Sequence, residues 1–286
     1  MGTTDGRVRT RRLANGMLAE IREDRWRRGS FELVVDGTPQ SHVDLDDPTE
    51  LAFEYVQRMA NVVDLVRPER VPITAIHLGA GALTLPRYIE ATRPGSRQQV
   101  IELDRGLVDF VREALPWDPR ASIRIRYGDA RAALRTLPDG LRGTADIVVV
   151  DVFAGARTPP HVTSVEFYRE TGRLLAPDGV LLVNLADGPP LRYARSQAAT
   201  VVEAVGPAVA LAESSIVKGR RFGNVVLAAS PGGIPERWLA PLFAAGPHPA
   251  AVLSGRELRE FSETAAVATD ATATGSPAPS RGVFRF

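Results

Sequence analysis

Short apolar runs alternate with segments of helical spacing from Val71 onwards. Strand-length apolar runs that are each followed by a helical pattern predict a parallel sheet covered by helices on both faces. The predicted strands are residues 74–78, 98–102, 123–127, 146–151 and 180–185. The predicted helices are residues 85–91, 106–115, 130–137, 164–175 and 192–204. The pattern therefore indicates an α/β protein with a doubly wound, mostly parallel, Rossmann-like sheet.

Two further strands, residues 208–217 and 224–230, follow with no helix between them. Two adjacent closing strands predict an antiparallel pair at the sheet edge, which is typical of the methyltransferase-like variant of this fold. Short helices are predicted at 235–243 and 256–261. Residues 265–279 are rich in Ala, Thr, Ser and Pro, which predicts a flexible tail.

The N-terminal residues follow a different pattern. Residues 17–23 and 30–35 are typical of strands, and Asp36-Gly37 is a hairpin-turn signal. Asp47 and Pro48 fit the N-cap and the first position of a helix over residues 47–66. The predicted organisation is an N-terminal β hairpin unit at 1–48, a connecting helix at 49–70, a nucleoside-binding domain at 71–262 and a flexible tail at 263–286.

The glycines after the first apolar run are the first candidate binding residues. Gly79 and Gly81 stand directly after residues 73–78, where glycine lets backbone N–H groups approach a ligand. Glu102 ends the next apolar run, 23 residues after Gly79, near the spacing at which a carboxylate reaches a ribose in a dinucleotide-type fold. The pattern predicts ribose binding by Glu102, and a tight turn with a solvated Glu102 is the alternative.

Other predicted strands also end in polar groups. Asp129 follows the third strand, Asp151 ends the fourth, and Asp187 lies beyond the fifth. Ligands of open parallel sheets bind outside these carboxyl ends. We expect Asp129 to accept a hydrogen bond from the adenine amine and the Ala130 N–H to donate to a ring nitrogen. The alternative for Asp129 is an N-cap of the helix that begins behind it.

Composition excludes several classes of function. The chain has 35 basic and 34 acidic residues, so its net charge of +1 gives no field that recruits nucleic acid or an anionic membrane. It has no cysteine, which excludes thiol catalysis and cysteine-ligated metals, and no metal is predicted. No run reaches the ~18 apolar residues of a membrane span. Residues 1–6 contain no signal-peptide apolar segment, so a cytoplasmic location is expected.

In this order and spacing, residues 31–230 resemble the spermidine synthase (polyamine aminopropyltransferase) family. Leu33–Gln40 resembles the family's Leu-Asp-Gly-x-x-Gln hairpin, and the resemblance implies that Gln40 touches the nucleoside. The other matching segments are the glycine loop 78–82, the ribose motif 100–104, the adenine motif 128–130, residues 146–151 and residues 166–168. The family places a small N-terminal β domain before a methyltransferase-like domain that binds decarboxylated S-adenosylmethionine.

The chain departs from this family where the amine groups are bound. The base that deprotonates the attacking amine is replaced by Ala154, and the acid of the glycine loop is replaced by Ala82. The tyrosine–histidine–glutamate run is present only as Ala52-Phe53-Glu54. Each lost carboxylate removes a charge-assisted hydrogen bond to an ammonium group, typically ~1.5–3 kcal/mol. We therefore expect weak or absent activity with putrescine.

Two carboxylates remain as catalytic candidates. Asp151 and Asp187 lie beyond strand ends, and an amine nucleophile needs a carboxylate within hydrogen-bond reach. Asp187 is equally an ordinary Asp-Gly turn residue. His77, inside the first strand, is interpreted as a core or pocket-wall residue.

Three functions are left open by the sequence. The first is aminopropyl transfer from decarboxylated S-adenosylmethionine to a small amine or polyamine. The second is methyl transfer from intact S-adenosylmethionine to a small molecule, and the third is a non-catalytic nucleoside- or polyamine-binding homologue. A homodimer is expected through the N-terminal β unit, with no nucleic-acid or membrane partner.

Overall fold

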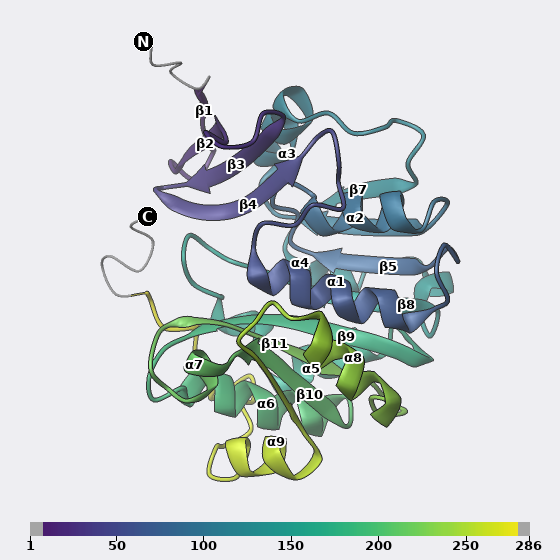
Figure 1. Cartoon of the computed structure of the whole chain (residues 1–286), viewed down its shortest axis with the longest axis vertical. Helices are drawn as coiled ribbons and strands as arrows, with labels where there is room; N and C mark the ends of the chain where they lie inside the picture. Colours follow the sequence, from purple (N-terminus) through teal and green to yellow (C-terminus); the bar gives the residue numbers. More distant parts are fainter. Residues whose placement is uncertain (1–7, 280–286) are drawn as a thin grey trace.

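The computed structural model describes residues 8–279 and contains two sheets (Figure 1). The N-terminal sheet is antiparallel, in the order β1-β2-β3-β4. Its strands are β1 (Val8–Arg12), β2 (Leu18–Glu23), β3 (Ser30–Val35) and β4 (Thr38–Asp44). Asp36 and Gly37 both have positive φ, which is what the tight turn between β3 and β4 requires.

The second sheet has eight strands in the order β12-β10-β11-β9-β8-β5-β6-β7. Its strands are β5 (Thr74–Leu78), β6 (Arg97–Glu102), β7 (Ile123–Tyr127), β8 (Ala145–Val150), β9 (Leu175–Asp187), β10 (Ala208–Glu213), β11 (Gly223–Ala229) and β12 (Ala250–Ser254). Strands β5 to β9 pair in parallel, whereas β10, β11 and β12 pair antiparallel. The predicted fold class and the antiparallel pairing of the closing strands β10 and β11 are confirmed, but the pair does not lie at the sheet edge, which β12 forms.

Helices cover both faces of this sheet. They are α1 (Glu54–Val66), α2 (Thr84–Thr92), α3 (Arg105–Ala114), α4 (Ala130–Leu134), α5 (Val165–Gly172), α6 (Arg192–Ala204), α7 (Ser214–Val217), α8 (Leu239–Ala245) and α9 (Gly255–Ser262). α1, α2 and α8 share an apolar cluster with Ala75 of β5, and α4, α5, α6 and α9 share another with Ile76. Neighbouring residues of a pleated strand face opposite sides, so one strand serves both clusters. α3 packs on the N-terminal sheet through Phe110.

The predicted start of the connecting helix is wrong. α1 begins at Glu54, and the Asp47 side chain instead accepts hydrogen bonds from the Thr49 amide (3.0 Å) and the Thr49 hydroxyl (2.6 Å). The capping residue therefore closes a local turn, seven residues before the helix. The strand expected over 208–217 also ends early, at Glu213, because α7 follows directly.

The segment 265–279 is not a flexible tail, although its composition predicts one. The Ala268 carbonyl accepts the Val165 N–H (2.8 Å), and buried Ser276 exchanges two hydrogen bonds with Thr158 (2.8 and 3.1 Å). Small side chains allow this close approach, since a Cβ at Gly275 would lie 2.7 Å from the Thr158 carbonyl oxygen. The rest of the predicted tail, residues 280–286, and the first seven residues of the chain lie outside the described part.

No helix within residues 8–279 is long and apolar enough to cross a bilayer. The same residues contain no group of three or more histidines and carboxylates arranged to hold a metal ion.

Candidate functional site

The candidate site lies at the carboxyl ends of the parallel strands. The chain runs from β5 outwards to β6 and β7 and then returns to β8 on the other side of β5, so the strand order reverses between β5 and β8. Ligands of doubly wound sheets bind at this kind of switch point. Gly79, Glu102, Asp129, Asp151 and Asp187 stand at or just beyond the ends of β5 to β9 and therefore share this edge.

The two glycine positions in the loop after β5 have no room for a side chain. Gly79 has φ of 97°, and a Cβ there would collide with the Asp151 carbonyl oxygen at the end of β8. Gly81 has φ of 49°, and its Cβ would collide with the Ser41 hydroxyl, which also accepts the Ala82 N–H at 3.0 Å. Both glycines are needed for close backbone approach. The N-terminal sheet, through Ser41 of β4, thus fixes the loop from outside.

Glu102 lies beside this loop, as its spacing from Gly79 predicts. One carboxylate oxygen accepts the Ala80 N–H at 2.9 Å, and the other accepts the Asp104 N–H at 2.9 Å. Burial raises the pKa of Glu102, and these backbone amides oppose that shift. Each carboxylate oxygen has a second lone pair. The Glu102 carboxylate therefore has acceptor lone pairs left for the two hydroxyls of a ribose. Ribose binding by Glu102 stays a prediction.

Asp129 serves as the N-cap that was the alternative for this residue. Its side chain accepts the Ala132 N–H at 2.9 Å at the start of α4, and its other oxygen lies 2.7 Å from His161 Nε2. Burial opposes ionisation, yet the Ala132 amide and the His161 ring hold the pKa of Asp129 below its usual value. Neither contact involves the Ala130 N–H. The adenine role of Asp129 and Ala130 stays a prediction.

The Asp151 carboxylate accepts hydrogen bonds from two side chains. Asn184 of β9 donates to one carboxylate oxygen at 2.8 Å, and the Tyr55 hydroxyl of α1 donates to the other at 3.3 Å. Asn224 of β11 in turn donates to the Asn184 amide oxygen at 2.9 Å. Burial raises the pKa of Asp151, and Asn184 and Tyr55 oppose that shift. This polar row crosses two strands and one helix.

Sequence reasoning missed Tyr55 and Asn224 as site residues, as well as the contact between Asn184 and Asp151. Asn184 and Asn224 are polar residues inside otherwise apolar strands, and this interruption is a readable signal. Their mutual contact is not readable, because it depends on the antiparallel register that pairs Asn184 with Val226.

Asp187 and Gln40 are both held by backbone groups. The Asp187 carboxylate accepts the N–H groups of Gly188 and Ala194, both at 2.8 Å, where β9 leads into α6. Burial raises the pKa of Asp187, and these amides oppose that shift. Gln40 donates to the Gly155 carbonyl at 3.1 Å, so it contacts the loop that follows β8. The catalytic role of Asp187 and the nucleoside contact of Gln40 stay predictions.

His77 is buried in β5, with Nε2 3.1 Å from the Gln98 side-chain oxygen. Burial lowers the pKa of His77 to about 4, against a weaker opposing effect of Gln98. A neutral histidine satisfied by one neighbour is a core residue, in agreement with the interpretation from sequence.

The two alanines that replace carboxylates have different surroundings. Ala82 is fully buried in the apolar cluster formed by α3 and the N-terminal sheet, with Leu33 and Phe110 among its members. Ala154 is exposed in the loop after β8, where its N–H donates to the Arg157 carbonyl at 2.8 Å. A side chain at 154 can change without disturbing the core, and one at 82 cannot.

Comparison with known proteins agrees with this geometry. A polyamine aminopropyltransferase of Vibrio vulnificus is 30% identical over 142 residues, which is 48% of this chain and 46% of that protein. The crystal structure of a probable spermidine synthase from Corynebacterium glutamicum is 29% identical, covers 93% of this chain and 97% of its own, and superposes with a TM-score of 0.84. Human methyltransferase-like protein 13 shares the fold, with 17% identity and a TM-score of 0.55. No family model matches the chain.

The eight-stranded sheet, its antiparallel end and the glycine loop beside Glu102 define the class of methyltransferase-like α/β proteins. Within this class, the likeness to curated polyamine aminopropyltransferases and to the structure of a probable spermidine synthase supports a member of the spermidine synthase family. The chain spans about half the length of the curated relatives it matches.

Proposed function

We propose that this protein is a spermidine synthase-like transferase that binds decarboxylated S-adenosylmethionine at the strand ends and transfers its aminopropyl group to a small amine. The observation that carries the proposal is Glu102 beside the glycine loop at the switch point, in a member of this family. A carboxylate is suited to a ribose because it accepts from both hydroxyls of the diol. Gly128 precedes the expected adenine contacts, and a Cβ added to it would meet no atom within 4 Å.

The reaction needs one base. The amine nitrogen attacks the aminopropyl carbon bonded to the sulfonium, and a C–N bond forms while the C–S bond breaks. Sulfur keeps the electron pair, methylthioadenosine leaves, and the ammonium proton passes to a carboxylate. Asp151 fits this role better than Asp187, because neutral side chains orient Asp151 whereas two backbone amides occupy Asp187.

A second candidate function is nucleoside binding with little turnover. It is favoured by exposed Ala154, which stands where the family places the base. Methyl transfer from intact S-adenosylmethionine gains less support, because the small side chain of Ala82 lies in an apolar cluster and opens no space for a methionine carboxylate.

Calorimetric titration with methylthioadenosine and with decarboxylated and intact S-adenosylmethionine tests the binding step. Tighter binding of the decarboxylated donor supports the proposal, and tighter binding of the intact donor favours methyl transfer. Aminopropyl transfer to putrescine, cadaverine and spermidine then tests turnover. Asp151→Asn should abolish any transfer, whereas Asp187→Asn should lower the melting temperature and keep most of it. The reverse result would identify Asp187 as the base.

The N-terminal sheet is the surface through which we propose homodimerisation. Trp26, in the loop between β2 and β3, is 96% exposed. Light scattering of the parent and of Trp26→Ser measures the mass directly, and an unchanged dimer in the variant would place the interface elsewhere. The cytoplasmic location and the lack of a nucleic-acid partner remain predictions from the sequence.

A further inference from the structure

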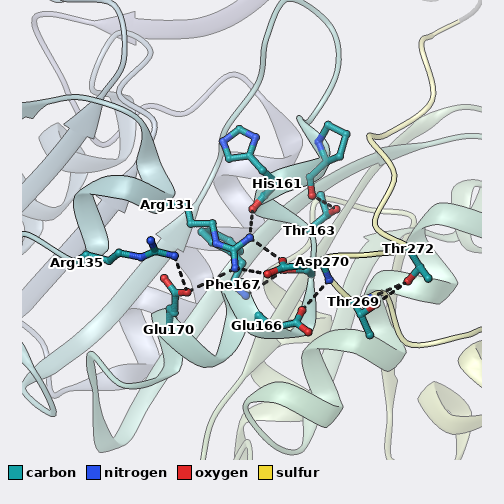
Figure 2. A network of polar contacts seen from close by, with 12 residues as sticks. Arg131, Arg135, His161, Thr163, Glu166, Phe167, Glu170, Thr269, Asp270 and Thr272 are labelled. Atoms are coloured by element: carbon teal, nitrogen blue, oxygen red, sulfur yellow. Dashed lines mark hydrogen bonds and ion pairs between the residues drawn. The ribbon is translucent and has the colours of Figure 1, made fainter.

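Asp270 forms hydrogen bonds with three residues of the body of the protein, two of them labelled in Figure 2. Its two carboxylate oxygens accept from Arg131 Nη1 and Nη2 at 2.7 and 2.8 Å, and the Ser164 hydroxyl donates to one of them. The Asp270 N–H donates to Glu166 at 2.9 Å. Arg131 holds the pKa of Asp270 down at about 2. A bidentate arginine–carboxylate pair fixes orientation as well as position.

Arg131 connects Asp270 to the expected adenine side of the site. Its Nη1 also donates to the His161 carbonyl at 3.3 Å, and the His161 ring lies 2.7 Å from the free oxygen of Asp129. Arg131 follows Ala130 directly in α4. One guanidinium therefore joins the helix that carries Asp129 and Ala130 to the loop that carries His161.

The same C-terminal segment holds the loop that follows β8. Thr158 and Ser276 exchange hydrogen bonds, the Thr163 hydroxyl donates to the Thr274 carbonyl at 3.2 Å, and Arg157 Nε donates to the Ser276 carbonyl at 2.8 Å. The loop is held from the other side by Gln40. The part of the loop that follows Ala154 thus depends on the C-terminal segment.

We propose that Asp270 is a positioning residue for recognition of the nucleoside base, acting through Arg131 and His161 on Asp129. The inference rests on the proposed function. Without Asp270, Arg131 loses its bidentate partner and keeps the longer ion pair with Glu170 (3.5 Å). Its hold on the His161 carbonyl is then weaker, and with it the placement of the His161 ring beside Asp129. The base-binding groups then sample several orientations, and ordering them on binding costs free energy.

The test compares two ligands that differ only in the base. 5′-Methylthioadenosine carries the exocyclic amine, and 5′-methylthioinosine carries a carbonyl oxygen at that position. We expect Asp270→Ala to weaken methylthioadenosine binding roughly tenfold, which is 1.4 kcal/mol, and to weaken methylthioinosine binding much less. Arg131→Ala should have the same effect, and the double variant should add nothing further. Asp270→Asn, which keeps the shape, should lie between the parent and Asp270→Ala.

The matched control is Glu203→Ala, which removes a surface ion pair with Arg169 (3.0 Å) on neighbouring helices. It should leave both affinities unchanged. Equal losses for the two ligands, together with a lower melting temperature, or unchanged affinities in Asp270→Ala, would overturn the inference. If the parent protein binds no methylthioadenosine, the proposed function fails instead.

Discussion

The proposed site at the strand ends has two halves, one proposed to bind the nucleoside and one proposed to bind the amine, and they are built differently. In the nucleoside half, Gly79 and Gly81 leave no room for a Cβ, and Glu102 is fixed by two backbone amides. In the amine half, the Asp151 carboxylate is held by the side chains of Tyr55 from α1 and Asn184 from β9, and Ala154 is exposed. Groups fixed by the backbone cannot change without altering the loop. Groups fixed by side chains can, and Ala154, which replaces the base of the spermidine synthase pattern, lies in this half.

The largest difference between the two halves should appear when a carboxylate is restored in the amine half, because turnover should then change while nucleoside affinity does not. Ala154→Asp places one where family enzymes carry their base, and general-base assistance is commonly worth about 10²–10⁴ in rate. We expect turnover with putrescine to rise by at least about 10², with the affinity for methylthioadenosine unchanged. Ala154→Asn is the matched uncharged control and should show no gain. Equal rates for the two variants would mean that position 154 does not reach the amine.

The corresponding change in the glycine loop should fail. Ala82→Asp buries a carboxylate in an apolar cluster, and burial of an unpaired charged group costs at least about 2 kcal/mol. We expect a lower melting temperature and no gain in turnover, measured by thermal unfolding and by transfer to putrescine. Ala82→Ser, a smaller and neutral change, controls for the added volume. An Ala82→Asp variant as stable as the parent would contradict the placement of this side chain in the core.

Breaking the nucleoside half should have a smaller but general effect. Glu102→Ala removes a charged acceptor, and we expect methylthioadenosine to bind about 10–150-fold more weakly. Glu102→Gln keeps an acceptor oxygen for one backbone amide and should lose less. Titration calorimetry measures both. Parent-like affinity in Glu102→Ala would show that this residue only supports the loop.

The smallest effect is expected from the polar row around Asp151. Because burial raises the pKa of Asp151, it takes up a proton at a higher pH than an ordinary aspartate, and transfer should fall correspondingly early on acidification. Asn184 stabilises the ionised form, so Asn184→Ala should raise the apparent pKa by roughly one unit, the worth of a hydrogen bond to a charged group. Asn224→Ala should shift it less, because Asn224 contacts Asp151 only through Asn184. An acid limb of the pH–rate profile that stays in place in Asn184→Ala would exclude Asp151 as the base.

The sequence predicts the parallel sheet well because each strand carries its own apolar run. It also places Gly79 beside Glu102, since their spacing follows from one strand–helix–strand unit. β1 and β12 were not predicted: β1 is Val-Arg-Thr-Arg-Arg, with no apolar alternation, and β12 is a five-residue edge strand. Their identity as strands comes from pairing with β2 and β10.

The contacts of the candidate site were harder to predict than its location. Asp129 and His161 are 32 residues apart, and Tyr55 and Asp151 are 96 apart, so no local pattern connects them. The prediction of a flexible tail over residues 265–279 was wrong for a related reason. Its Ala, Ser, Thr and Gly residues match a disordered composition, and the same small side chains allow Ser276 to reach Thr158.

The pairing of Arg131 with Asp270 also has a consequence for how the protein is made. The two residues are separated by 139 positions, and contacts that close such long stretches of chain form late in folding. Ribosomes deliver the N-terminal residues first, so β5, β6 and α4 emerge well before Asp270. A nascent chain that stops between Arg131 and Asp270 contains Gly79, Gly81 and Glu102 but lacks the Arg131–Asp270 pair. Arg131, next to the strand-end residues Asp129 and Ala130, therefore receives its partner from one of the last described residues to be synthesised.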